Sequence, residues 1–109
     1  MMHWLLAFLF GQAIELPIYW RALKNRSAAQ RLVIGFAATA LTHPFVWFVF
    51  PRLFEDFVPM CVAAETFALV VEAAWLRHFG VRRALAWSLA ANGASFTLGL
   101  LSSVCLGWP

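Results

Sequence analysis

Three glutamates of this chain lie inside long apolar runs, where a carboxyl group is costly and calls for a chemical reason. Glu15 lies in the first apolar run, and Glu65 and Glu72 lie in the third. On insertion scales a charged side chain at the centre of a bilayer costs roughly 2.5 to 3.5 kcal/mol, and such residues commonly bind protons or cations. The glutamates are therefore the first candidates for function.

Other polar residues share helical faces with these glutamates, because spacings of three and four residues place side chains on one side of a helix. The candidate site comprises Glu15, His43, Glu65, Glu72 and Asn92, with Gln12, Thr39, Thr42, Ser88 and Ser95 as supporting residues. A rise of 1.5 Å per residue predicts two layers, at roughly 7 to 12 Å and about 17 to 20 Å from the cytoplasmic boundary. The first layer holds Glu15, Thr39, Glu72 and Asn92, the second holds His43, Glu65 and either Ser95 or Thr97, and Gln12 falls between the layers.

This polar column has alternative explanations. Interhelical hydrogen bonds, worth about 0.6 kcal/mol each on average, could explain the hydroxyl and amide groups without any function. They explain the carboxyls less well, because Gln would pack without an ionisation penalty. His43 with Glu65 and Glu72 could hold Fe, Mn or Zn, although neither a metal nor a cofactor is assigned. No nucleophile motif surrounds the serines, so an enzyme is disfavoured.

The elements that must position these residues are membrane helices. The chain has 109 residues, of which 63% are apolar and 12% charged, whereas soluble domains are about one quarter charged. A bilayer crossing needs about 20 apolar residues. We therefore predict an all-α, four-helix transmembrane bundle in one domain of residues 1–109, with spans at about 3–23, 32–50, 58–76 and 84–107.

Two features inside the predicted spans affect their interpretation. The first run is expected to be retained rather than cleaved as a signal peptide, because it lacks a basic leader and contains Gln12, Glu15 and Pro17. In the second span, Pro44 removes a backbone donor directly after His43 and predicts a kink there.

The loop charges predict the orientation of the bundle. The basic residues that flank the first and third connections are Arg21, Lys24, Arg26, Arg31, Arg77, Arg82 and Arg83. The second connection has Arg52 beside Glu55 and Asp56. By the positive-inside rule both termini lie on the non-cytoplasmic side, and a bacterial inner membrane is the expected location. Basic residues in short loops of this kind do not indicate nucleic acid.

In length, helix number and the single carboxylate of its first span, Glu15, the chain resembles the small multidrug resistance transporters. In that family such a glutamate is the shared site for protons and substrate, which the resemblance implies for Glu15. The chain departs from the family pattern in two respects. It has Glu65 and Glu72 in the third span, and its loop charge bias is seven basic residues to one.

Two functions are consistent with these observations. The first is a small proton-coupled or cation-coupled transporter, in which Glu15 and Glu72 form the inner site and His43 with Glu65 conducts protons toward the middle. The second is a non-catalytic accessory subunit whose polar faces bind partner helices, a cofactor or a metal. The expected partners are the lipid bilayer and either further copies of the chain or a larger membrane complex.

The topology can be tested with reporter fusions. Fusions at Ala28 or Gly80 should report a cytoplasmic location, and fusions after Pro109 an external one, because the basic loops remain inside. Paired alkaline phosphatase and fluorescent-protein reporters provide the measurement. A uniform reversal would overturn the orientation and leave the spans unchanged.

Overall fold

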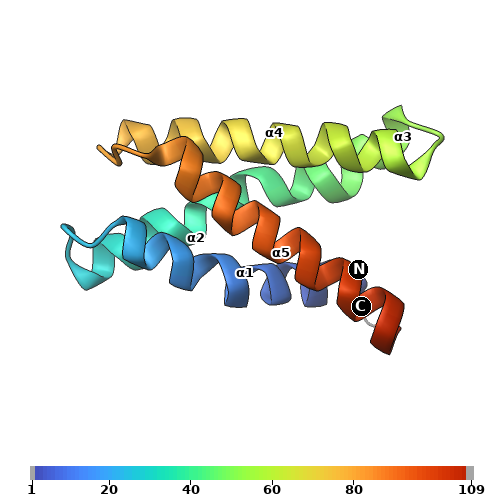
Figure 1. Ribbon diagram of the computed structural model, residues 1–109, viewed down its shortest axis with the longest axis horizontal. Helices are drawn as coiled ribbons and strands as arrows, with labels where there is room; N and C mark the ends of the chain where they lie inside the picture. The colour runs from blue at the N-terminus through green and yellow to red at the C-terminus, as the bar shows by residue number, and fades with distance from the viewer. Residues whose placement is uncertain (1, 108–109) are drawn as a thin grey trace.

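The computed structural model describes the backbone of residues 2–107 and the side chains of residues 4–107. Regular secondary structure in this part of the chain is entirely helical (Figure 1). Its elements are α1 (Met2–Ala22), α2 (Ala28–Pro44), the π-helical η1 (Phe45–Val49), α3 (Phe50–Leu53), α4 (Phe57–His78) and α5 (Ala84–Leu106). The all-α prediction is confirmed, and the helix ends fall within a few residues of the predicted spans.

Three helical stretches are long and apolar enough to cross a membrane. They are Ala28–Leu53, which combines α2, η1 and α3, then Phe57–His78 and Ala84–Leu106. Helix α1 has 21 residues but includes Gln12, Glu15 and Pro17, which lower its hydropathy. Large apolar side chains such as Val33 and Val104 are exposed on the outer faces, 68% and 77% respectively. This surface is suited to lipid contact rather than to water.

The long helices form a four-membered arrangement in which α5 packs against α4 and α1, and α2 packs against the same two helices. Helix α5 crosses the bundle obliquely, from beside the end of α4 toward the beginning of α1 (Figure 1). The helices are therefore close together at the end that carries the first and third connections and diverge toward the other end. The buried apolar core lies at the close-packed end and includes Leu23, Ile34, Ala38, Leu76, Val81, Ala84 and Ala91.

Two arginines stabilise the connections at the close-packed end. Arg31 donates hydrogen bonds to the carbonyl groups of Leu23 and Lys24, which follow the end of α1 and lack helical partners. Arg26 donates to the carbonyl of Phe79 at 2.7 Å and lies over its ring. The Arg26 bond joins the first connection to the end of α4.

A π turn directly follows Pro44, the residue at which the sequence predicts a kink. After Pro44 the N–H of Phe50 bonds to the carbonyl of Phe45, five residues earlier. The helix then continues to Leu53, beyond the predicted end at residue 50. Such π turns are rare and often lie at functional sites.

Gly35 permits the close approach of α2 to α1. A Cβ added there would lie 2.8 Å from Leu16 Cδ1 and 3.5 Å from Tyr19 Cβ, whereas one added at Gly93 would meet nothing within 4 Å. We expect Gly35→Val to reduce the free energy of unfolding by about 1 to 3 kcal/mol through overpacking. Gly93→Val is the control, since it makes the same change of residue without the clash. Denaturant unfolding in detergent micelles measures both, and equal losses would contradict the packing role.

Candidate functional site

Two buried carboxyl groups occupy the centre of the bundle. Glu15 of α1 is 5% exposed and Glu72 of α4 is 1% exposed. Helices α1 and α4 are diagonal to each other in the four-membered arrangement, so side chains that point inward from them meet at the centre. The two carboxyls are close enough to interact directly. The sequence predicted this pair at a common depth.

Glu72 accepts hydrogen bonds from three other helices. Its Oε1 accepts from the Tyr19 hydroxyl of α1 at 2.5 Å and from the Asn92 amide of α5 at 3.2 Å. Its Oε2 accepts from the Thr42 hydroxyl of α2 at 2.7 Å. This one carboxyl therefore connects α4 to each of the other long helices.

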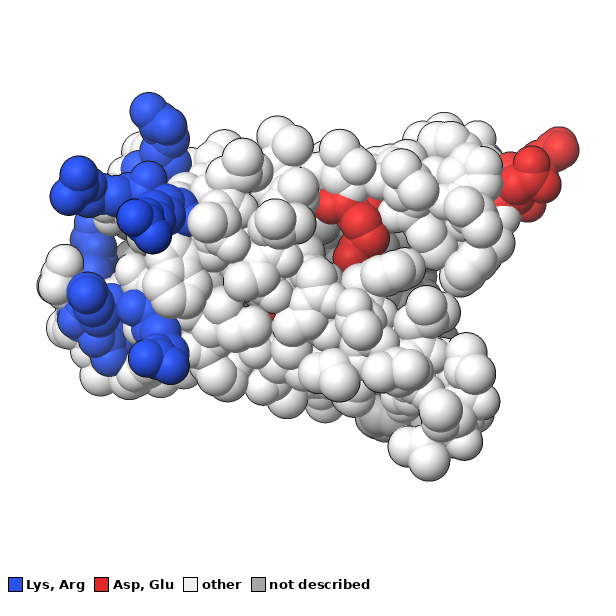
Figure 2. Space-filling model, in the orientation of Figure 1, with Lys and Arg blue, Asp and Glu red and all other residues white. Residues whose placement is uncertain are grey.

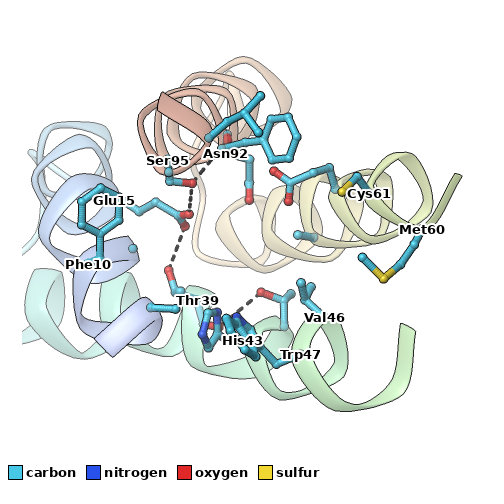
Figure 3. Close-up of a pocket in the computed structure, with 18 of the residues that line it drawn as sticks. Phe10, Glu15, Thr39, His43, Val46, Trp47, Met60, Cys61, Asn92 and Ser95 are labelled. Atoms are coloured by element: carbon cyan, nitrogen blue, oxygen red, sulfur yellow. Dashed lines mark hydrogen bonds between the residues drawn. The ribbon is translucent and has the colours of Figure 1, made fainter. Parts of the chain in front are cut away.

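Glu15 is held in the same way from two sides. Its Oε1 accepts from Thr39 of α2 at 2.9 Å, and its Oε2 accepts from Ser95 of α5 at 2.5 Å (Figure 3). All four oxygens of the carboxyl pair thus have donors. Those donors are hydroxyl and amide groups, and no ion pair to Glu15 or Glu72 occurs within residues 4–107. Within the described residues the pair is therefore stabilised by neutral hydrogen-bond donors and has no basic partner.

The remaining supporting residues join helices near the pair. Ser88, which is fully buried, donates to the carbonyl of Leu69 at 2.8 Å and accepts from Asn92 at 3.2 Å. Gln12 donates to the carbonyl of Phe36 at 3.1 Å, while its Oε1 is buried without a partner among the described residues. These contacts link α5 to α4 and α1 to α2.

A cavity of about 400 Å³ extends from the carboxyl pair toward the end where the helices diverge. Several aromatic side chains line it, and Phe10, His43 and Trp47 are labelled in Figure 3. Glu65 also lines the cavity. The lining residues that bear on function are Phe10, Glu15, His43, Trp47, Phe57, Glu65, Glu72 and Phe96. The arrangement places two carboxyls at the deep end of an otherwise mostly apolar chamber.

Glu65 lies in this cavity but apart from the hydrogen-bonded pair. It is half-buried and has no hydrogen bond or ion pair with any residue whose side chain the structure describes. It also lines a second hollow of about 470 Å³ between α4 and α5. Glu65 is therefore an unpartnered carboxyl at the junction of the two hollows.

His43 makes no hydrogen bond or ion pair with Glu65 among the described residues, although both line the cavity, so the predicted relay stays a prediction. Its ring lies among Trp4, Phe8 and Trp47, with centroid distances of 5.9, 5.2 and 6.2 Å. Its Nε2 atom is buried and lacks a hydrogen-bond partner within the described part of the chain. The two residues share only the cavity.

The proposed metal ligands, His43 with Glu65 and Glu72, are likewise not gathered. Within the described residues there is no group of three or more His, Cys, Asp or Glu side chains arranged to hold a metal ion.

Tyr19 was not among the predicted site residues, although it makes the shortest hydrogen bond to Glu72. It is fully buried and donates the 2.5 Å bond described above. Its position four residues after Glu15 places it on the same helical stripe, and this spacing was the signal that could have included it. The aromatic cavity wall was also not predicted.

Comparison with protein-family models, with curated proteins and with solved structures finds no match to this chain. The fold and site define it as a helical membrane protein with glutamates buried at its centre. What it does must be argued from that site.

The bond from Thr42 to Glu72 should contribute measurably to stability. We expect Thr42→Val, which removes the hydroxyl at nearly constant shape, to lower the free energy of unfolding by about 1 to 3 kcal/mol, since it leaves a buried acceptor unpaired. The matched control is Thr66→Val, because Thr66 is exposed and bonds only its own helix at the Val62 carbonyl. That variant should stay within about 0.5 kcal/mol of the parent. Similar losses in both variants, measured by unfolding in detergent, would exclude a special role for the Glu72 contact.

Proposed function

We propose that the protein is a small proton-coupled or cation-coupled transporter whose central binding site is the Glu15–Glu72 pair. The observation that carries this proposal is the pair itself, two buried carboxyls without a basic partner at the deep end of a cavity. Purely structural contacts would not require two acids at one point, because neutral polar side chains also join membrane helices through hydrogen bonds.

Charge gives the pair its proposed activity. Two ionised carboxylates about 4 Å apart repel each other by about 4 kcal/mol at an effective dielectric constant of 20. One proton or one small cation bound between them removes most of this repulsion. The hydroxyl groups of Thr39 and Ser95 orient Glu15 without supplying that charge. The pair is thus suited to bind and release a single positive charge.

The proposal includes α1 as a fourth membrane crossing. Its polar residues Gln12, Glu15 and Tyr19 are all buried against the bundle, whereas Leu5 and Leu9 on the outside are 44% and 54% exposed. A helix of 21 residues rises about 31 Å, close to the thickness of the hydrocarbon core. Helix α1 would therefore present the apolar side chains of Leu5 and Leu9 to lipid.

The cavity provides the route on one side of the pair. Aromatic rings such as Phe10, Trp47 and Phe96 attract cations through their faces, and Glu65 lies between the pair and the wide end. On the other side, the buried core around Leu23 and Leu76 closes the bundle. Transport would require a second conformation that opens this core, and a chain of 109 residues would assemble as a homo-oligomer to enclose the pathway.

A second candidate, the accessory subunit, is favoured by the hollow between α4 and α5. This groove of about 470 Å³ has an apolar wall interrupted by Glu65, Thr66 and Thr97. A partner helix with a polar side chain could lie there and bind the unpartnered Glu65 carboxyl.

The transport proposal predicts loss of ion flux without loss of fold. Glu15→Gln and Glu72→Gln match a protonated carboxyl, with one acceptor oxygen and one donor group, but cannot ionise, so each should reduce proton-coupled flux by at least about tenfold. Proteoliposomes containing a pH-sensitive dye provide the measurement, with Na⁺, K⁺ and tetramethylammonium gradients as probes. The control is Glu55→Gln, which removes an exposed carboxyl in the second connection and should leave flux unchanged.

If both variants support the parent's flux, the pair is structural and the transport proposal fails. Affinity purification from a mild detergent then separates the candidates. A transporter should purify as a homo-oligomer, while a subunit should retain a different membrane protein in stoichiometric amount. The Glu65→Gln variant should weaken that retention if the α4–α5 groove is the contact.

A further inference from the structure

A third, chemically different cavity lies at the close-packed end of the bundle. Its volume is about 600 Å³, and it lies between the end of α1, the first and third connections and the beginning of α5. Four of its lining side chains are basic, namely Arg21, Lys24, Arg82 and Arg83. Figure 2 shows the basic side chains gathered at this end of the molecule, with acidic side chains at the opposite end.

These four side chains differ from Arg26 and Arg31 because they do not hydrogen-bond the connections together. Arg26 and Arg31 donate to backbone carbonyl groups, as described above. The cavity residues make no side-chain hydrogen bond or ion pair within the described residues, and all four are exposed. Like charges gathered without acidic partners repel one another, so a bound anion would stabilise them.

Trp87 gives the cavity an amphipathic edge. It lines the cavity and packs partly buried against the core beside Val81 and Ala84. Its indole N–H has no hydrogen-bond partner in the described part of the chain, and indoles favour the boundary between headgroups and acyl chains. From Trp87, spacings of three and four residues place Ala90, Ala94, Leu98 and Leu101 on the same face of α5. Leu98 and Leu101 are 46% and 53% exposed. An apolar strip therefore leads away from the basic cavity along α5.

We propose that this basic cavity binds a phosphate group, presented by an anionic phospholipid whose acyl chains lie along the exposed face of α5. Arginine guanidinium groups bind phosphate oxygens through paired charge-assisted hydrogen bonds. Basic pockets between membrane helices bind the headgroups of acidic lipids in this way. The neighbouring leucines favour a lipid over a free phosphate ion, because a soluble ligand would leave that strip unused. This site is independent of the carboxyl pair and of the proposed transport.

The test measures lipid retention by native mass spectrometry of the purified full-length protein in mild detergent. The probes are phosphatidylglycerol and, as the neutral comparison, phosphatidylcholine. We expect the parent to retain phosphatidylglycerol preferentially, and the double variant Arg82→Gln, Arg83→Gln to lose about tenfold or more of that affinity, since both lost charges face the phosphate. Both residues are exposed, so thermal unfolding without added lipid should be unchanged.

The matched control is Arg77→Gln, which removes one exposed charge at the same end but does not line the cavity. Its affinity should stay within about twofold of the parent, as expected for a distant screened charge. Inorganic phosphate and glycerol 3-phosphate are added as competitors to separate the two sources of the phosphate group. Displacement of the lipid by either identifies the phosphate as the recognised group, and lack of displacement identifies the intact lipid. Equal retention by the parent and the double variant, or an equal loss in Arg77→Gln, would overturn the proposal.

Discussion

Two carboxyl groups buried in an apolar bundle must find hydrogen-bond donors inside the protein, since lipid supplies none. The donors for Glu15 and Glu72 come from α1, α2 and α5, and each is a side chain rather than a backbone group. A shift of any one helix would therefore leave a carboxyl oxygen unpaired. The carboxyl pair therefore fixes the relative positions of the long helices.

Side-chain hydrogen bonds between helices are concentrated in the half of the molecule near the basic connections. The cavity results from their uneven distribution. Near the basic connections, Trp75 donates to the carbonyl of Ile34 and Arg26 donates to that of Phe79. Beyond the carboxyl pair the helices are joined mainly by aromatic contacts, such as Phe45 with Phe67. Helix α5 diverges from α4 where the polar contacts end. Figure 2 shows basic side chains gathered at one end of the molecule, whereas acidic side chains lie both at the opposite end and in the middle of the bundle.

Sequence reasoning recovered the helices and part of the site. Helical spacing and the rise per residue placed Glu15 and Glu72 at one depth, and the structure brings them together. The same reasoning does not show how His43 and Glu65 lie relative to each other, because depth along the membrane normal does not determine the direction in which a side chain points. That direction depends on the crossing of α5 and on the π turn after Pro44, which result from packing of the whole chain. Tyr19 was not included because helical spacing places it beside Glu15 but does not show its contact with Glu72 across the bundle.

The π turn at Phe45–Val49 also determines the shape of the cavity wall. Thr39, His43, Trp47 and Pro51 all line the cavity at four-residue intervals. In a regular α-helix each such step overshoots a full turn by about 40°, so Pro51 would point about 120° away from Thr39. Hydrogen bonds that span five residues wind the chain less per residue and return part of this rotation. The π turn therefore keeps these four side chains on the cavity wall, whereas the twist of a regular α-helix would turn the last of them away from the cavity.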